Sequence, residues 1–220
     1  MKVALAIGLS SLLLAGCASN LSKPEEYSGF LKDYSRLKEA KSPSGAPVMR
    51  WIDPHLDSKA YTSVYIEPTQ FYPEPAPTQQ IPASTLQGIT RYYDQALKRE
   101  LAKSLPLASG PGPGVIVVRA AITAVSSRTE GLKPYEVIPI ALVAAAVTTA
   151  AGSRDQETDI ATEAVFLDGG SQKVLAQVVR KGTGEPLENT STVMKPQDVK
   201  NVIDGWAMDL HNSWLKLKNK

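Results

Sequence analysis

Cysteine is nearly missing from this chain, because Cys17 is the only one among 220 residues. A single thiol forms no intramolecular disulfide, which excludes a disulfide scaffold and a metal site built from several cysteines. Histidine is almost as scarce. The chain has only His55 and His211, and neither lies in a metal-ligand spacing such as H-E-x-x-H. The sequence therefore predicts neither a metal site nor a cofactor.

An excess of charge of one sign is also lacking. The chain carries 24 basic and 22 acidic residues, which gives a net charge of +2 at pH 7. Proteins that bind nucleic acids need a clear basic patch, so nucleic acid is not an expected partner. The glycine-rich stretch 110–114 does not read as a phosphate loop, since its prolines lack the amide hydrogen that would bind phosphate.

The first residues have the pattern of a targeting segment. Lys2 is followed by the apolar run 3–14, which is too short to cross a bilayer as a helix. The next residues fit a lipobox, the recognition pattern that precedes a lipidated cysteine. The lipobox residues are Leu14, Ala15 and Gly16. We predict that residues 1–16 are cleaved as a lipoprotein signal peptide and that Cys17 takes up lipid.

The lipid on Cys17 makes a membrane the first expected partner. Mature lipoproteins normally carry two or three acyl chains such as palmitate, and each buried methylene contributes about 0.8 kcal/mol to anchoring. Ala18 follows the cysteine, whereas lipoproteins retained at the inner membrane often have aspartate at this position. We therefore expect a periplasm-facing protein anchored in the outer membrane rather than in the inner membrane.

Residues 17–48 are predicted to form a lipidated tether with a short helix that begins at Pro24. Apolar residues there recur at three- and four-residue spacing, which places them on one helix face. They are Tyr27, Phe30, Leu31, Tyr34 and Leu37. The segment 42–47 is rich in proline, glycine and serine and is expected to end this helix. Residues 49–220 have the length of a single domain.

Within residues 49–220, apolar periodicity predicts two helices and four strands. The helices are expected at 84–104, capped by Ser84, and at 196–217, and the strands at 61–67, 115–127, 158–167 and 173–181. Alternation in the strand 115–127 places Ile116, Val118 and Ile122 on one face and Val115, Val117 and Val125 on the other. The element order predicts an α/β fold, with a small mixed sheet of about four to five strands and two main helices packed on one face.

The segment 137–151 is apolar and contains no charged residue. As a helix it would be about 22 Å long, which is short of the roughly 30 Å hydrocarbon core of a bilayer. Three interpretations remain open. The segment forms a buried or half-buried connecting helix, or it is a contact surface for a second copy of the chain, an envelope protein or the membrane, or, although short for this, it spans the bilayer. The contact residues would then be Val137, Ile138, Ile140, Leu142, Val143 and Val147.

Three acidic residues fall on alternate strand positions and therefore on one face of the sheet. They are Glu157, Asp159 and Glu163. A solvated sheet face explains this pattern better than a paired-carboxylate site for acid–base chemistry. Together with His55 they are the only candidates for catalysis, and the chain lacks the G-x-S-x-G motif of serine hydrolases. The sequence therefore predicts no catalytic residue and a protein that is not an enzyme.

Several short motifs resemble those of one family. The most specific are Ser28-Gly29-Phe30-Leu31 and Tyr61-x-x-Val64-x-Ile66-x-Pro68, accompanied by Trp51-Ile52-Asp53-Pro54 and Phe71-Tyr72-Pro73. Together they resemble the proteobacterial lipoproteins grouped as domain of unknown function 3313, over most of the chain. The resemblance implies a periplasm-facing lipoprotein, and it brings no established activity. We expect a non-enzymatic binding or assembly role in the envelope. The alternatives are an envelope hydrolase or other enzyme, and a carrier of a lipophilic ligand.

Overall fold

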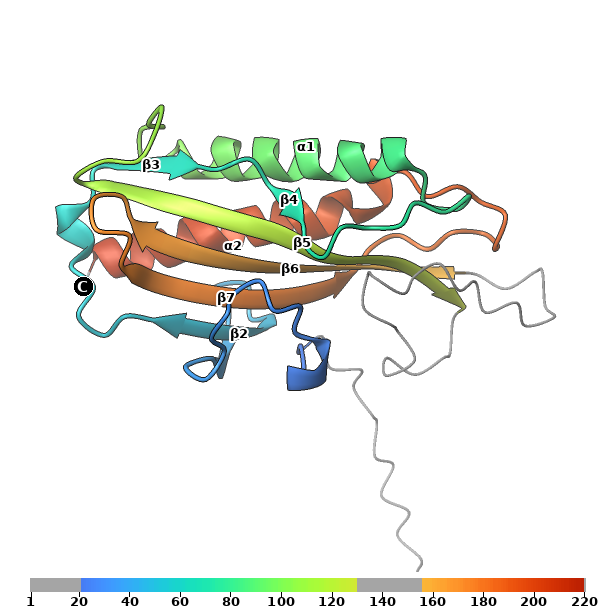
Figure 1. Ribbon diagram of the computed structural model, residues 1–220, viewed down its shortest axis with the longest axis horizontal. Helices are drawn as coiled ribbons and strands as arrows, with labels where there is room; N and C mark the ends of the chain where they lie inside the picture. Colours follow the sequence, from blue (N-terminus) through green and yellow to red (C-terminus); the bar gives the residue numbers. More distant parts are fainter. Residues whose placement is uncertain (1–20, 130–155, 220) are drawn as a thin grey trace, which may run out of the picture.

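The computed structural model describes residues 21–129 and 156–219, which form one sheet with helices on one face (Figure 1). The strands are β1 (Lys38–Lys41), β2 (Pro47–Ile52), β3 (Ser63–Ile66), β4 (Gln70–Phe71), β5 (Val115–Thr129), β6 (Gln156–Asp168) and β7 (Val174–Thr183). The α-helices are α1 (Ala83–Leu101) and α2 (Lys200–Lys218), and the 3-10 helices are η1 (Pro24–Glu26), η2 (Ser58–Ala60) and η5 (Pro196–Val199). In this part of the chain, no helix is long and apolar enough to cross a membrane.

The sheet has seven strands in the order β1-β2-β7-β6-β5-β3, with β4 paired to β5. The expected α/β architecture is confirmed, but the expected count of four to five strands is too low. The strands β1 and β2 form an antiparallel hairpin that begins in the region assigned to the tether, and the breaker-rich segment 42–47 contains its turn. Pro47 starts β2, a position where proline is tolerated because little strand pairing precedes it.

The chain before β1 also differs from the expectation. The helix predicted from Pro24 is the single short turn η1, after which the backbone continues as turns. Leu31 and Leu37 are buried against Val179 of β7 and pack beside Trp51 of β2. This segment therefore lies on the sheet face opposite the helices, and it belongs to the folded domain.

Strand β5 runs through the middle of the sheet, antiparallel to β6 and parallel to β3. Ile116, Val118 and Ile122 pack in the core beneath the helices, as the alternation predicts. A register shift between Ile122 and Ala124 inserts one extra residue, so Val125 packs in the same core. The prediction that Val125 faces the other side is wrong, because a bulge inverts the alternation of every later residue.

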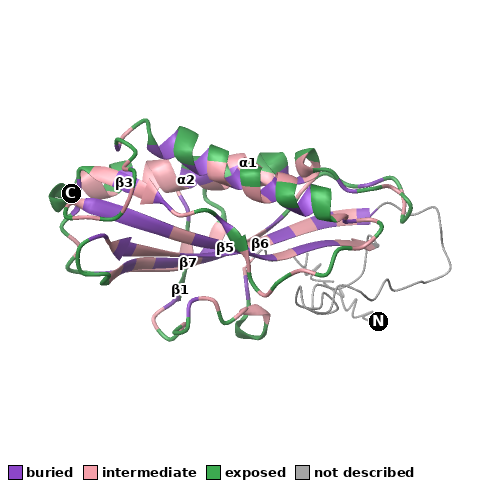
Figure 2. Ribbon diagram, turned by 45° about the horizontal axis from the view of Figure 1, so that its top comes forward, coloured by how far each residue is buried: buried purple, intermediate pink, exposed green. Residues whose placement is uncertain are grey.

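The two helices bury the stripes that their spacing predicts. In α1 the buried apolar residues are Leu86, Ile89, Tyr93, Ala96, Leu97 and Leu101. The N-cap of α1 is Pro82 rather than the expected Ser84. In α2, the apolar residues Ile203, Ala207 and Trp214 are buried, together with Asp209. Figure 2 shows buried and exposed positions alternating along α1. The contact of Arg180 with Asp209 places α2 against β7.

Candidate functional site

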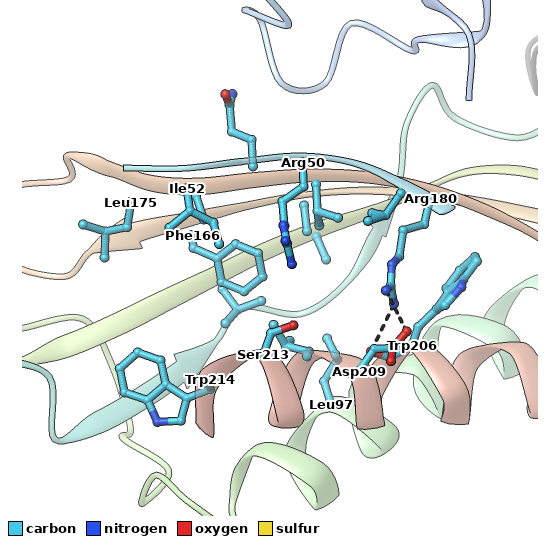
Figure 3. A pocket seen from close by; sticks show the side chains of 18 of the residues that line it. Arg50, Ile52, Leu97, Phe166, Leu175, Arg180, Trp206, Asp209, Ser213 and Trp214 are labelled. Atoms are coloured by element: carbon cyan, nitrogen blue, oxygen red, sulfur yellow. Dashed lines mark hydrogen bonds and ion pairs between the residues drawn. The ribbon is translucent and has the colours of Figure 1, made fainter. Parts of the chain in front are cut away.

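A cavity of about 110 Å³ lies between α2 and the helix-facing side of the sheet (Figure 3). We refer to it as the α2 cavity. Its apolar lining residues include Ile52, Leu97, Phe166, Leu175, Leu210 and Trp214. The space exists because small side chains, Ala164, Ala176 and Ser213 among them, stand where larger ones would fill it. Small-molecule sites are usually concave and mostly apolar with a few polar groups, so the cavity is a candidate site.

One polar wall of the α2 cavity is a buried ion pair. Arg180 of β7 donates from Nη2 to Oδ2 of Asp209 at 2.8 Å, and their side chains are 11% and 5% exposed. The backbone N–H and the hydroxyl of Ser44 donate to the same carboxylate, each at 2.9 Å. Burial raises the pKa of Asp209, but hydrogen bonds from Ser42 and Ser44 and the charge of Arg180 lower it more, so its net pKa is below the usual value.

A second arginine faces the α2 cavity from β2. Arg50 pairs in register with Val178, and Figure 3 shows its side chain extending from the sheet toward α2. Within residues 21–129 and 156–219, its guanidinium makes no hydrogen bond or ion pair. Burial and the nearby charge of Arg180 lower the pKa of Arg50. The cavity thus combines apolar walls with one cation that has no counter-ion.

Glu163, one of the three predicted acidic residues, is fully buried at 0% exposure, so the expectation of a solvated face is wrong for it. Its carboxylate accepts the hydroxyl of Tyr34 at 2.6 Å and the backbone N–H of Ser28 at 2.8 Å. Burial, and then the hydrogen bond to Glu163, raise the pKa of Tyr34 to about 12. Glu163 therefore holds the N-terminal segment on the outer face of the sheet.

Replacing Glu163 by alanine should loosen that segment. The change leaves the hydroxyl of Tyr34 and the amide of Ser28 without an acceptor, at a cost of about 1–3 kcal/mol. Amide hydrogen exchange should rise across residues 28–37 and stay unchanged in β5. Glu25→Ala, at an exposed position of η1, is the control. Equal protection of residues 28–37 in both variants would show that Glu163 does not hold the segment.

The other predicted candidates for catalysis are not brought together. Arg128 pairs with Asp159 at 2.6 Å and also with Glu157. Glu157 and Asp159 lie at the start of β6. His55 is exposed in the turn after β2, and β2 ends at Ile52, which is level with the far end of β6. In the described ranges, no cluster of three or more His, Cys, Asp or Glu is placed to hold a metal ion.

His211 of α2 contacts the turn that follows α1. Its Nδ1 is 3.0 Å from the hydroxyl oxygen of Ser104, and the residue is half-buried. Two further predictions fall outside the described residues. These are lipidated Cys17 with its lipobox, and the proposed contact segment 137–151.

Sequence reasoning missed Arg50 and the cavity that it faces. A usable signal was present, because Arg50 stands between apolar residues in the run Met49-Arg50-Trp51-Ile52. In a strand with one covered face, such a residue either points to solvent or enters the core. Only the pairing of β2 with β7 decides that Arg50 faces α2.

Residues 26–210 match the family model described as a protein of unknown function, DUF3313. The chain belongs to the DUF3313 family. This confirms the resemblance carried by the Ser28–Leu31 and Tyr61–Pro68 motifs. A relative in Escherichia coli K12, named as the uncharacterized lipoprotein YdcL, is 42% identical over 208 residues, which cover 94% of this DUF3313 chain and 93% of the relative.

Two solved structures show a distant likeness to this DUF3313 protein. The dodecameric PelC of Paraburkholderia phytofirmans has a TM-score of 0.39 at 8% identity, covering 74% of this chain and 96% of PelC. Protein XCC0632 of Xanthomonas campestris has a TM-score of 0.40 at 14% identity, covering 76% and 91% of the two chains. Likenesses at this level give no guide to function.

Proposed function

We propose that this DUF3313 protein is a lipid-anchored envelope lipoprotein that binds a lipophilic molecule in the α2 cavity. The observation that carries the proposal is the cavity itself, about 110 Å³ in volume and lined mainly by aliphatic and aromatic side chains. Apolar cavities of roughly 150 Å³ stay dry and take up molecules such as benzene. Arg50, Trp206 and Ser213 in its wall are only partly buried, so the cavity is not sealed from the surface.

The position of the folded domain supports a role at the membrane surface. Ser22 is already buried, at 5% exposure, five positions after Cys17. Even a fully extended chain spans at most about 3.6 Å per residue, which limits the distance from Cys17 to Ser22 to roughly 18 Å. With acyl chains on Cys17, as the lipoprotein name of the E. coli relative supports, the domain would remain next to the lipid. We place it at the outer membrane, facing the periplasm.

A binding role suits the polar residues better than catalysis does. The carboxylates of Glu157 and Asp159 are paired with Arg128, and Glu163 is committed to the N-terminal segment. None of these groups lines the α2 cavity. Assembly with an envelope protein or with a second copy of the chain stays a prediction, because it depends on the segment 137–151.

Filling the α2 cavity should stabilise the protein and abolish binding. Ser213→Leu places an apolar side chain in the space, which should raise the free energy of unfolding by about 0.5–2 kcal/mol. The same change should remove binding of 1-octanol, an uncharged lipophilic probe. Binding is followed by methyl NMR shifts of Leu175 and Leu210 in the full mature chain held in lipid nanodiscs, so that the signal reports the cavity rather than partitioning into lipid.

The matched control is Lys216→Leu, which adds a similar side chain on the exposed face of α2. It should leave both the octanol shifts and their concentration dependence unchanged. If wild-type Leu175 and Leu210 show no saturable shift with octanol, the proposed function is wrong. Equal binding by the Ser213→Leu variant would place the site elsewhere.

A further inference from the structure

The α2 cavity is polarised along its length. In Figure 3 the rings of Phe166 and Trp214 lie away from the side where Arg180 meets Asp209, and Arg50 extends into the space between these two ends. A molecule with one apolar chain and one charged group fits such a space better than a uniformly apolar molecule does. The charge on that group decides which class of lipid it is.

The charges facing the α2 cavity add up to one uncompensated cation. Arg180 is neutralised by Asp209, whose oxygens also accept two hydrogen bonds from Ser44. In the described ranges, Arg50 alone among the charged lining residues makes no ion pair. Arg50 is half-buried, so water offsets only part of the cost of leaving this cation unpaired. A ligand with a single negative charge would remove that cost.

We propose that the α2 cavity binds a free fatty acid, with its carboxylate held by the guanidinium of Arg50 and its chain in the apolar end. This inference rests on the proposed function and adds the class of ligand. The planar guanidinium presents parallel N–H donors that match the two oxygens of a carboxylate. The chain packs on Phe166, Leu175 and Trp214, which line the cavity.

Two features favour a fatty acid over a phospholipid or a lipid phosphate. A phosphate monoester carries about −1.5 to −2 charges at pH 7, which one unpaired arginine does not balance. The cavity volume of about 110 Å³ also suits part of one acyl chain rather than two. The remainder of a longer chain would leave along the partly exposed side near Ser213.

The experiment compares probes of one chain length that differ only in the head group: octanoate, 1-octanol and octyl phosphate. The full mature chain in nanodiscs is titrated with each, and the methyl shifts of Leu175 and Leu210 give apparent dissociation constants. Octanoate should bind wild type about tenfold or more tightly than octanol, since hydrogen bonds to charged groups are the strong ones. Octyl phosphate should bind no more tightly than octanoate.

Variants of Arg50 isolate the contribution of its guanidinium to octanoate binding. Arg50→Gln should weaken octanoate binding about tenfold to a hundredfold and leave octanol binding within about twofold of wild type. Arg50→Lys keeps the positive charge but loses the two parallel donors of the guanidinium. Its affinity for octanoate should therefore lie between those of wild type and Arg50→Gln. Arg36→Gln is the matched control, because Arg36 lies over the ring of Trp51 on the outer side of the sheet, away from the cavity.

The stability of the empty protein supplies a second, independent readout. If Arg50 serves a ligand, Arg50→Leu should unfold at a higher urea concentration than wild type, because it removes an unpaired cation from an apolar wall. A lower midpoint would make Arg50 a structural residue and overturn the inference. The inference would also be overturned if Arg50→Gln lost octanoate and octanol binding equally, or if wild type bound octyl phosphate more tightly than octanoate. In each of those cases saturable octanol binding would still stand, and with it the proposed function.

Discussion

Asp209→Ala should destabilise the fold by about 3–5 kcal/mol, because it leaves the buried guanidinium of Arg180 without a counter-ion. The pair is 11% and 5% exposed, so water does little to replace the lost carboxylate. The change also removes the acceptor of the Ser44 amide and hydroxyl, which hold the β1–β2 turn against α2. Urea unfolding, followed by circular dichroism, should show a large fall in midpoint at a similar slope.

The double variant Arg180→Met/Asp209→Leu separates the two causes of this loss. Replacing a buried pair by apolar residues of similar volume is often close to neutral, so most of the stability should return. A residual loss would measure the hydrogen bonds from Ser44. If the free energy of unfolding of Asp209→Ala were within about 1 kcal/mol of wild type, the Arg180–Asp209 pair could not be the buried contact that joins β7 to α2.

The helices and the β6–β7 hairpin were predictable because their signals are local. The stripe from Leu86 to Leu101 follows helical spacing, and the turn between β6 and β7 begins with Asp168-Gly169-Gly170. The Asp168 side chain accepts the amides of Gly170 and Ser171, which is the ordinary chemistry of a tight turn. Neither feature needs information from distant parts of the chain.

The hairpin of β1 and β2 was not predictable from such signals. Strand β1 reads Lys-Glu-Ala-Lys, which carries no strand preference, and β2 starts with a proline. β2 pairs with β7, more than a hundred residues later in the chain, and β1 pairs with β2. The same long-range pairing turns Arg50 toward α2 and brings the N-terminal segment over Glu163. The sequence therefore shows the residues of the candidate site but not that the fold brings them together.

Export with an ordinary secretory signal peptide in place of residues 1–17 should release this protein from the membrane completely. The acyl chains on Cys17 are the expected anchor, and no described helix could replace them by spanning a bilayer. Wild type should sediment with outer-membrane fragments, whereas the variant should appear in the osmotic-shock fluid. Because the described domain begins after Cys17, the released variant should keep the wild-type circular dichroism spectrum and should still bind octanoate.

Cys17→Ser, with the natural signal retained, distinguishes lipidation from simple export. Without the thiol that takes up the lipid, we expect a longer chain that keeps residues 1–16, detectable by intact mass. The wild-type N-terminal peptide should instead begin at Cys17 and carry the added mass of its acyl groups. If the released variant still sedimented with membranes, another surface of the domain would bind them. The lipidated segment from Cys17 to Ser22, roughly 18 Å at full extension, would then not be what keeps the α2 cavity close to lipid.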